Sequence, residues 1–170
     1  WSAVNGSLSV AGSAMRLTGP AGVEYSGART VPLEIVEGER IRVAFDLVAR
    51  NRVGSLRVWF RWYTVSDIYL STEVVMNTTN TATGRRYSSY TTPPLNATHV
   101  QVQIGFTPNS PSQSAYIDIK DVMLANDADS DGHSALDGDD GVGRYWNGTP
   151  NNSISVYAPP RDIEVSGTPI

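Results

Sequence analysis

Apolar and polar residues alternate along several stretches of this 170-residue sequence, and no stretch shows the helical spacing of about 3.6 residues. The clearest alternation lies in residues 40–49, 56–65 and 99–106. Successive side chains of a strand point to opposite faces of a sheet, so such alternation is typical of an antiparallel strand with one buried face. The sequence therefore predicts an all-β fold.

In two of these stretches the pattern separates a core face from a solvent face. Residues 40–49 and 99–106 place these apolar side chains on one face: Ile41, Val43, Phe45 and Leu47, and Val100, Val102, Ile104 and Phe106. Residues 56–65 carry Leu56, Val58, Phe60 and Trp62 on one face and Arg57, Trp59, Arg61 and Tyr63 on the other. Because both of these faces contain aromatic residues, the alternation leaves open which of them is buried.

Further strands and the turns between them complete the predicted fold. The strands are expected at residues 6–18, 23–36, 67–77, 84–92 and 115–124, the last with a bulge near Asp121. Residues rich in Gly, Pro and Asn separate them, at 19–20, 37–38, 51–54, 92–94 and 108–111. About eight short antiparallel strands in ~125 residues predict two sheets packed face to face, a β-sandwich of the jelly-roll type.

The composition changes after Leu124. Residues 126–141 contain six Asp and almost no apolar residue, which is typical of an acidic loop. Residues 144–157 then predict a small hairpin that turns near Asn147-Gly148 or Asn151-Asn152. We therefore predict a jelly-roll domain at 1–125, an acidic loop with an appended C-terminal hairpin at 126–157, and a linker or tail at 158–170.

Composition and charge exclude several classes of site. The sequence has no cysteine and two histidines, which excludes disulfide scaffolds, thiolate zinc sites and sites built from several histidines. Its net charge of −4 argues against nucleic acid as a partner, and no apolar run is long enough to predict membrane insertion. The chain begins at Trp1 rather than Met, which indicates a fragment, a processed product or the ordered part of something longer.

Four segments, in this order, resemble the C-terminal module of minor tail proteins from siphophages of Gram-positive bacteria. They are residues 31–50, 88–106, 115–125 and 136–157, and the most specific piece is the ending Trp146-Asn147-Gly148-Thr149-Pro150-Asn151-Asn152-Ser153. That module is similar to the jelly-roll carbohydrate-binding modules attached to glycanases. The resemblance implies an extracellular location at the tail tip of a virion. It also implies bacterial surface carbohydrate and other tail proteins as partners, with a homo-oligomer as a further option.

The stripe formed by Trp59, Arg61 and Tyr63 is the first candidate binding site. Sugars stack their flat C–H faces on aromatic rings, and planar Arg and Gln side chains bind their hydroxyl groups. Gln101 and Gln103, with His99, line the outward face of another long strand, and the two stripes together predict a shallow glycan-binding groove. The alternative is that this face packs on a neighbouring subunit or on the appended hairpin.

Acidic residues provide two candidate sites for a structural Ca²⁺, the one cofactor that we consider. Asp127, Asp129 and Asp131 have the spacing of the first half of an EF-hand loop, although Gly138 stands where the last ligand belongs. Asp118 and Asp121 resemble the acidic residues that hold calcium in jelly-roll modules, and Glu24, Glu34 or Glu37 could complete that site. The alternatives are a solvated linker and a surface ion pair with Lys120 or an Arg.

No nucleophile motif or phosphate-binding loop occurs in the sequence, so we predict a protein that is not an enzyme. The first functional hypothesis is a phage tail domain that binds a host cell-surface or cell-wall glycan. The second is a structural domain for tail assembly or decoration that contacts other tail subunits. The third is a carbohydrate-binding module of a secreted glycanase.

Overall fold

The computed structural model describes residues 1–126 and the backbones of two strands at 144–147 and 154–157. Within that part the chain forms strands and no helix. The strands are β1 (Ser2–Val4), β2 (Ser7–Ala11), β3 (Ala14–Gly19), β4 (Ser26–Arg29), β5 (Leu33–Glu34), β6 (Ile41–Asn51), β7 (Val53–Tyr63), β8 (Tyr69–Thr78), β9 (Arg85–Thr91), β10 (His99–Pro108), β11 (Ala115–Asn126), β12 (Arg144–Asn147) and β13 (Ile154–Tyr157).

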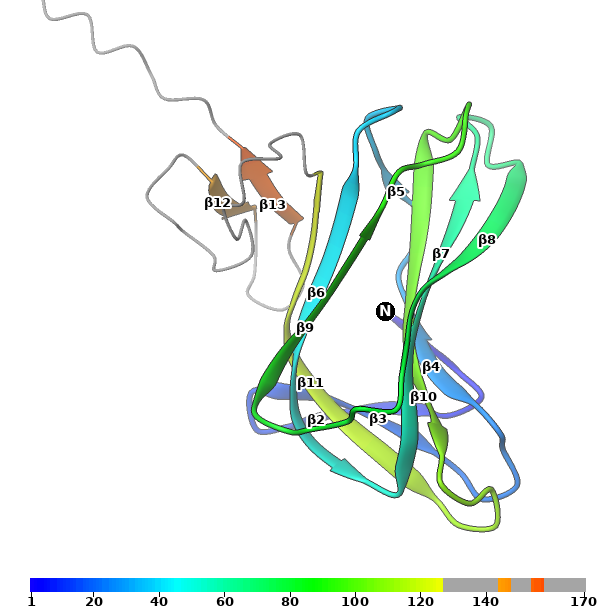
Figure 1. Ribbon diagram of the computed structural model, residues 1–170, viewed down its shortest axis with the longest axis vertical. Coiled ribbons are helices and arrows are strands. Elements are labelled where there is room, and N and C mark those ends of the chain that lie inside the picture. Colours follow the sequence, from blue (N-terminus) through cyan, green and yellow to red (C-terminus); the bar gives the residue numbers. More distant parts are fainter. Residues whose placement is uncertain (127–143, 148–153, 158–170) are drawn as a thin grey trace, which may run out of the picture.

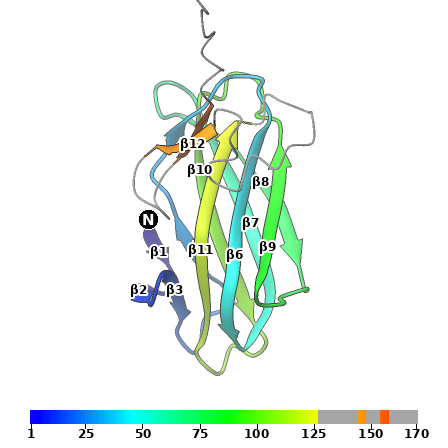
Figure 2. The same cartoon turned by 90° about the vertical axis from the view of Figure 1, so that its left-hand side faces the viewer.

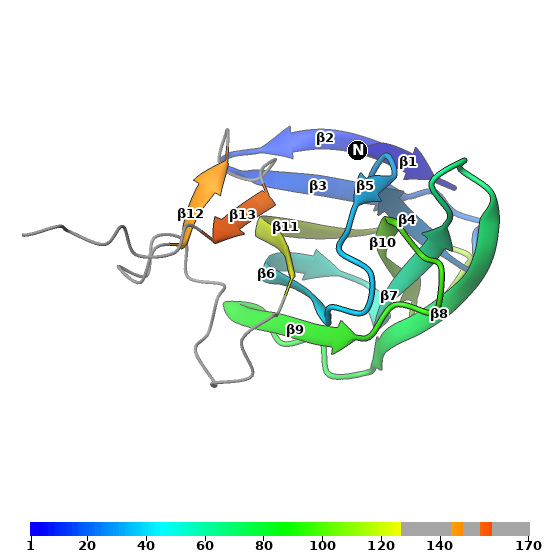
Figure 3. The same cartoon turned by 90° about the horizontal axis from the view of Figure 1, so that it is seen from above.

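Two antiparallel sheets pack face to face, which confirms the predicted all-β sandwich (Figure 1). The first, sheet A, has the strand order β1-β4-β10-β7-β8, with β5 also paired to β10. The second, sheet B, has the order β2-β3-β11-β6-β9. The long strands β11, β6 and β9 run side by side in front of β10, β7 and β8 in Figure 2, and Figure 3 shows the two layers from above.

The core lies between the sheets and is built from the alternating apolar residues of the long strands. Every apolar residue predicted to face inward from 40–49 and 99–106 is at most 2% exposed. The structure also decides the face of residues 56–65, because Leu56, Val58, Phe60 and Trp62 are buried in the core. Trp59, Arg61 and Tyr63 therefore point away from the core, on the outer surface of sheet A.

Two of the predicted strands are each divided in the structure. Residues 6–18 form the hairpin of β2 and β3, whose two-residue turn lies between the paired residues Ala11 and Ala14. Gly12 occupies the first turn position with a φ of 63°, a conformation that favours glycine and that a type II′ hairpin turn requires there. Residues 23–36 are likewise divided into β4 and β5. The prediction of single strands in these regions was wrong, because alternation detects neither the tight turn between β2 and β3 nor the interruption between β4 and β5, which both pair with β10.

The other local predictions concern β11 and the end of the chain. The register between β11 and β6 shifts between Lys120 and Met123, and Asp121 has a φ of 49°, which confirms the predicted bulge. Near the end of the chain, β12 and β13 pair antiparallel as a hairpin, and β13 lies against β11. The described residues include no helix of the length and apolarity that a membrane span needs.

Candidate functional site

The outer surface of sheet A carries a continuous group of aromatic, guanidinium and amide side chains. We call this surface the Trp59 face and define it by Tyr25, Arg29, Arg57, Trp59, Arg61, Tyr63, Gln101 and Gln103. Strand pairing sets its geometry, because residues opposite each other in an antiparallel pair project to the same side of the sheet. The face is therefore fixed by four hydrogen-bonded strands, β4, β10, β7 and β8.

Trp59 lies in the middle of a row that crosses these four strands. It is paired with Gln103 of β10 on one side and with Val74 of β8 on the other, and Gln103 is paired in turn with Arg29 of β4. Val74 is 53% exposed, so the row has an accessible apolar end beside the indole ring. An extended ligand could lie along this row with the tryptophan at its centre.

A second and a third row lie beside the first. Arg61 is paired with Gln101, and Tyr63 is paired with His99 and with Tyr69. The rings of Tyr63 and Tyr69 meet edge to face with their centroids 5.9 Å apart. The structure thus brings all five predicted glycan-binding residues, Trp59, Arg61, Tyr63, Gln101 and Gln103, onto one face.

Tyr25 belongs to the same face, although the sequence analysis did not select it. It comes from the connection between β3 and β4, and its ring meets Trp59 edge to face with centroids 4.6 Å apart. Its hydroxyl oxygen accepts a hydrogen bond of 3.0 Å from Nε2 of Gln103. The ring lies over Gly27 and Gly105, and a Cβ at either glycine would collide with the Tyr25 hydroxyl. Tyr25 therefore holds Trp59 and Gln103 in place from the side.

The electrostatics of Tyr25 reflect both its burial and its charged neighbours. Burial raises the pKa of Tyr25 to about 12, because removal from water disfavours the phenolate. The hydrogen bond from Gln103 and the positive charges of Arg57 and Arg61 act in the opposite direction. The Tyr25 hydroxyl is thus neutral at physiological pH and lies within reach of two guanidinium charges.

Some polar atoms of the Trp59 face are bonded and others are not. Gln101 Nε2 donates to the carbonyl oxygen of Thr30 at 2.9 Å, which ties that side chain to the backbone. Gln103 Oε1 and Arg61 Nε are buried, and neither has a hydrogen-bond partner among the described residues. Buried polar groups are ordinarily paired, so two unpaired ones on a single face are unusual.

The two acidic residues predicted for calcium on β11 do not form a metal-binding cluster in the structure. The Asp118 carboxylate accepts hydrogen bonds from Arg16 Nε and NH2 at 2.7 and 2.8 Å, and Arg16 also lies 4.1 Å from the centre of the Tyr116 ring. The hydrogen bond to Asp118 raises the pKa of Arg16. The Asp121 carboxylate lies 3.5 Å from Lys120 Nζ. Both residues thus take part in ion pairs, the alternative that the sequence analysis left open.

Within the part of the chain that the structure describes, no three acidic or histidine side chains are grouped as a metal site requires. Asp127, Asp129 and Asp131 lie outside the described residues. Calcium binding by the acidic loop therefore stays a prediction.

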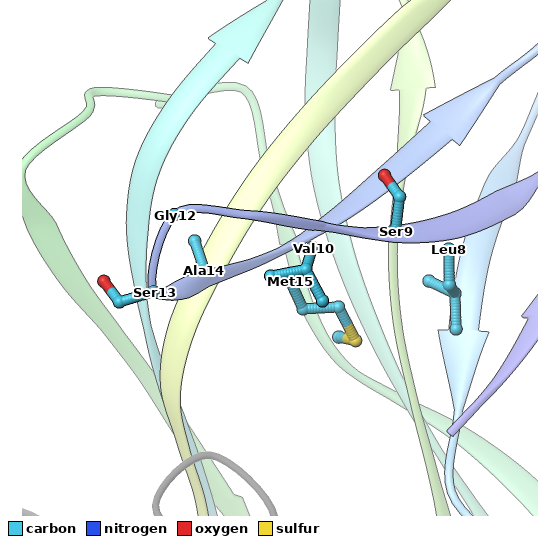
Figure 4. Close-up of a pocket in the computed structure, with 7 residues that line it drawn as sticks. All are labelled: Leu8, Ser9, Val10, Gly12, Ser13, Ala14 and Met15. Atoms are coloured by element: carbon cyan, nitrogen blue, oxygen red, sulfur yellow. The ribbon is translucent and has the colours of Figure 1, made fainter.

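A separate hollow lies on the β2–β3 hairpin, away from the Trp59 face. Leu8, Val10 and Met15 point to the same side of the hairpin, and the other lining residues are Ser9, Gly12, Ser13 and Ala14 (Figure 4). None of these residues carries a charge. The hollow therefore offers apolar surface without groups that could direct a polar ligand.

Comparison with known proteins extends only to the fold. No protein-family model matches the sequence, and no curated protein matches it. The enzymatically active domain of tailspike protein 4 from bacteriophage CBA120 aligns with 65% of this chain at 12% identity and a TM-score of 0.51, and the chain spans 15% of that structure.

Two carbohydrate-binding structures are also similar. A CBM4 structure aligns over 72% of this chain and 91% of its own at 16% identity, with a TM-score of 0.49. The N-terminal cellulose-binding domain of Cellulomonas fimi β-1,4-glucanase C aligns over 72% and 85% at 18% identity, also with a TM-score of 0.49. At these levels of identity the likeness concerns the β-sandwich.

Proposed function

We propose that this chain is a non-catalytic domain that binds carbohydrate on the Trp59 face. The observation that carries the proposal is the row through Trp59, in which an outward-pointing indole ring lies between the amide of Gln103 and the accessible apolar side chain of Val74. Aromatic rings provide large contact area for the C–H faces of sugars at low cost in conformational entropy. Amide and guanidinium groups on either side supply directional hydrogen bonds for hydroxyl groups.

Contacts between the side chains of the Trp59 face hold them in place, which supports a ligand-binding role for this face. Tyr25 packs edge-on against Trp59, and Gln103 is held by its hydrogen bond to Tyr25. Side chains that are already ordered lose less conformational entropy when a ligand binds, so the entropic cost of binding is smaller. A shallow site of this kind binds each sugar chain weakly, and several linked copies would raise the overall affinity.

The biological setting that we propose is the tail tip of a bacteriophage, with a bacterial cell-surface or cell-wall glycan as the ligand. The support for it is the resemblance of four sequence segments to siphophage minor tail proteins, including the ending at residues 146–153. In this setting the domain is extracellular, and other tail proteins position its copies. The related alternative, a binding module of a secreted glycanase, uses the same face in the same way.

A structural role in assembly is the second candidate function. It is favoured by apolar side chains exposed around β8, at the edge of sheet A, where Ile68, Tyr69 and Val74 are 63%, 55% and 53% exposed. Exposed apolar groups on an edge strand are a common feature of protein–protein contacts. In that case Trp59 and Tyr69 would be buried between subunits.

Binding of the purified chain to a glycan array and to bacterial cell walls, with and without EDTA, tests these functions. We expect Trp59→Ala to weaken binding by about tenfold or more, because it removes the stacking surface. The matched control is Tyr90→Ala, which removes a ring that is 55% exposed on sheet B instead. Loss of binding in Trp59→Ala alone supports the proposed site, and equal binding by both variants overturns it. A folded chain that binds no glycan but self-associates through Trp59 and Tyr69 supports the assembly role.

A further inference from the structure

Three arginines surround Trp59 on its face. Arg57 and Arg61 lie two residues before and after Trp59 on β7, so their side chains project to the same side of sheet A. Arg29 lies in the same row as Trp59, two strands away across β10. Strand geometry separates Arg57 from Arg61 by roughly 13 Å along β7 and Arg29 from Trp59 by about 10 Å across the sheet.

Among the described residues these three arginines have no acidic partner, unlike Arg16 and Arg86 of sheet B. In sheet B, Arg16 is paired with Asp118, and Arg86 lies 3.0 Å from Asp46. No carboxylate among the described residues lies at ion-pairing distance from Arg29, Arg57 or Arg61. Within the described part of the chain, Arg57 Nε donates to the neutral amide of Asn77 at 3.3 Å, and Arg61 Nε is buried with no hydrogen-bond partner.

The residues around the three arginines are neutral as well. The strand pairing places Gln101 and Thr72 beside Arg61, Gly105 and Asn77 beside Arg57, and Gln103 beside Arg29. In the described part of the chain, Glu34 is the one acidic residue that the pairing puts on this face, at its far end next to His99. A chain with a net charge of −4 thus carries a local patch of positive charge around the half-buried, outward-facing indole of Trp59.

A neutral sugar would offer the three guanidinium groups hydroxyl groups but no opposite charge. Guanidinium groups bind carboxylates and phosphates through paired, charge-assisted hydrogen bonds that are about twice as strong as neutral ones. Arginines on both sides of the ring, separated along the strand, suit a polymer with repeated anions better than a single charged group.

We propose that the carbohydrate bound by the Trp59 face is an anionic glycan, in which sugar rings stack on Trp59 and repeated carboxylate or phosphodiester groups bind Arg29, Arg57 and Arg61. This inference rests on the proposed function. Both anion types present oxygens that a guanidinium binds in the same way, so the shared chemistry is an oxyanion carried on a sugar chain.

The test compares a pair of polymers that differ in charge but not in sugar, and adds a phosphodiester polymer and a neutral glucan. Polygalacturonate and its methyl ester have the same backbone, with and without the carboxylate, and a glucosylated poly(glycerol phosphate) provides the phosphodiester. We expect binding of at least one anionic polymer to be about tenfold tighter than binding of the methyl ester and of a neutral glucan, and to weaken as salt is added. The preferred polymer then identifies which anion the face selects.

Charge-removing variants assign the effect to this face. Arg57→Gln and Arg61→Gln should each weaken binding of the anionic polymer by about tenfold and weaken binding of neutral glycans less, because glutamine loses the charge and keeps a hydrogen-bond donor. The control is Arg50→Gln, which makes the same charge change at an exposed position near the end of β6. Thermal unfolding of each variant checks that the fold is intact.

The possible failures are distinguishable. If the methyl ester binds as tightly as the acid and still depends on Trp59, the anionic preference is wrong and the carbohydrate-binding function stands. If Arg50→Gln weakens binding as much as Arg61→Gln, the attraction belongs to the overall charge and the inference is overturned. If the folded chain binds no carbohydrate of either kind, the proposed function fails and this inference fails with it.

Discussion

At the scale of single residues, Tyr25 shows how a side chain outside the predicted stripes organises the site. It packs on Trp59, accepts a hydrogen bond from Gln103 and lies within reach of two arginine charges. The sequence did not reveal this, because it placed Tyr25 inside an expected strand at residues 23–36, whereas in the structure Tyr25 precedes β4 and alternation does not describe its orientation. Its partners lie tens of residues away in the chain, so only the strand pairing brings them to it.

The raised pKa of Tyr25 predicts a loss of stability at alkaline pH. A tyrosine in the unfolded chain ionises near pH 10, whereas Tyr25 in the folded protein ionises at about 12. The stability is therefore fully present below pH 10 and is lost as the pH rises from 10 to 12. The loss should be about 2–3 kcal/mol, measured by urea unfolding across that range. Tyr25→Phe, which cannot ionise, should show a flatter profile, and an unchanged profile in this variant would contradict the assignment.

At the scale of elements, the alternation of apolar and polar residues predicted which side of a strand is buried, but it did not predict where a strand turns. The buried faces of β6 and β10 follow from period-two patterns, because a one-sided apolar strand must turn that side to the core. The face of β7 stayed open, because Trp59 and Trp62 are both aromatic and only the packing of sheet B decides between them. The β2–β3 turn was missed because one glycine with a positive φ interrupts a run that otherwise reads as a strand.

The strand β4 supports the site through Gly27, and this role can be tested. A Cβ at Gly27 would collide with the Tyr25 ring, and its next neighbour, the carbonyl oxygen of Ile104, is 3.2 Å away. We expect Gly27→Ala to destabilise the fold by about 1–3 kcal/mol and to weaken ligand binding, because Tyr25 must move away from Trp59. Trp fluorescence and thermal unfolding report the two effects.

A double-mutant cycle with Tyr25→Ala isolates the cause. Once the Tyr25 ring is gone, the closest remaining neighbour of the added methyl group at Gly27 is the carbonyl oxygen of Ile104 at 3.2 Å, a contact that a shift of a few tenths of an ångström would relieve. Gly27→Ala should then cost less than about 1 kcal/mol, so the two changes should be strongly non-additive. Equal costs of Gly27→Ala in both backgrounds would show that Tyr25 does not rest on this glycine.

At the scale of the whole molecule, the two sheets of the sandwich carry different features. The Trp59 face belongs to sheet A, whereas the hairpin strand β13 lies against β11 of sheet B. Every residue of the described core cluster precedes Asn126, and both sheets of the sandwich are complete by that residue. The sandwich thus contains the strands and the apolar contacts that a single domain of this size needs.

We therefore expect a chain ending at Asn126 to fold and to bind carbohydrate as the full chain does. Its thermal midpoint should lie within a few degrees of the full chain, because the described core is unchanged and the contacts of β13 that the structure describes lie along β11. Any rise in the midpoint on adding Ca²⁺ should appear in the full chain alone, since Asp127, Asp129 and Asp131 are then absent from the shorter one. A shortened chain that unfolds without cooperativity would instead make the C-terminal segment part of the domain. A Ca²⁺ effect that persists in a cooperative shortened chain would place the ion on the sandwich itself.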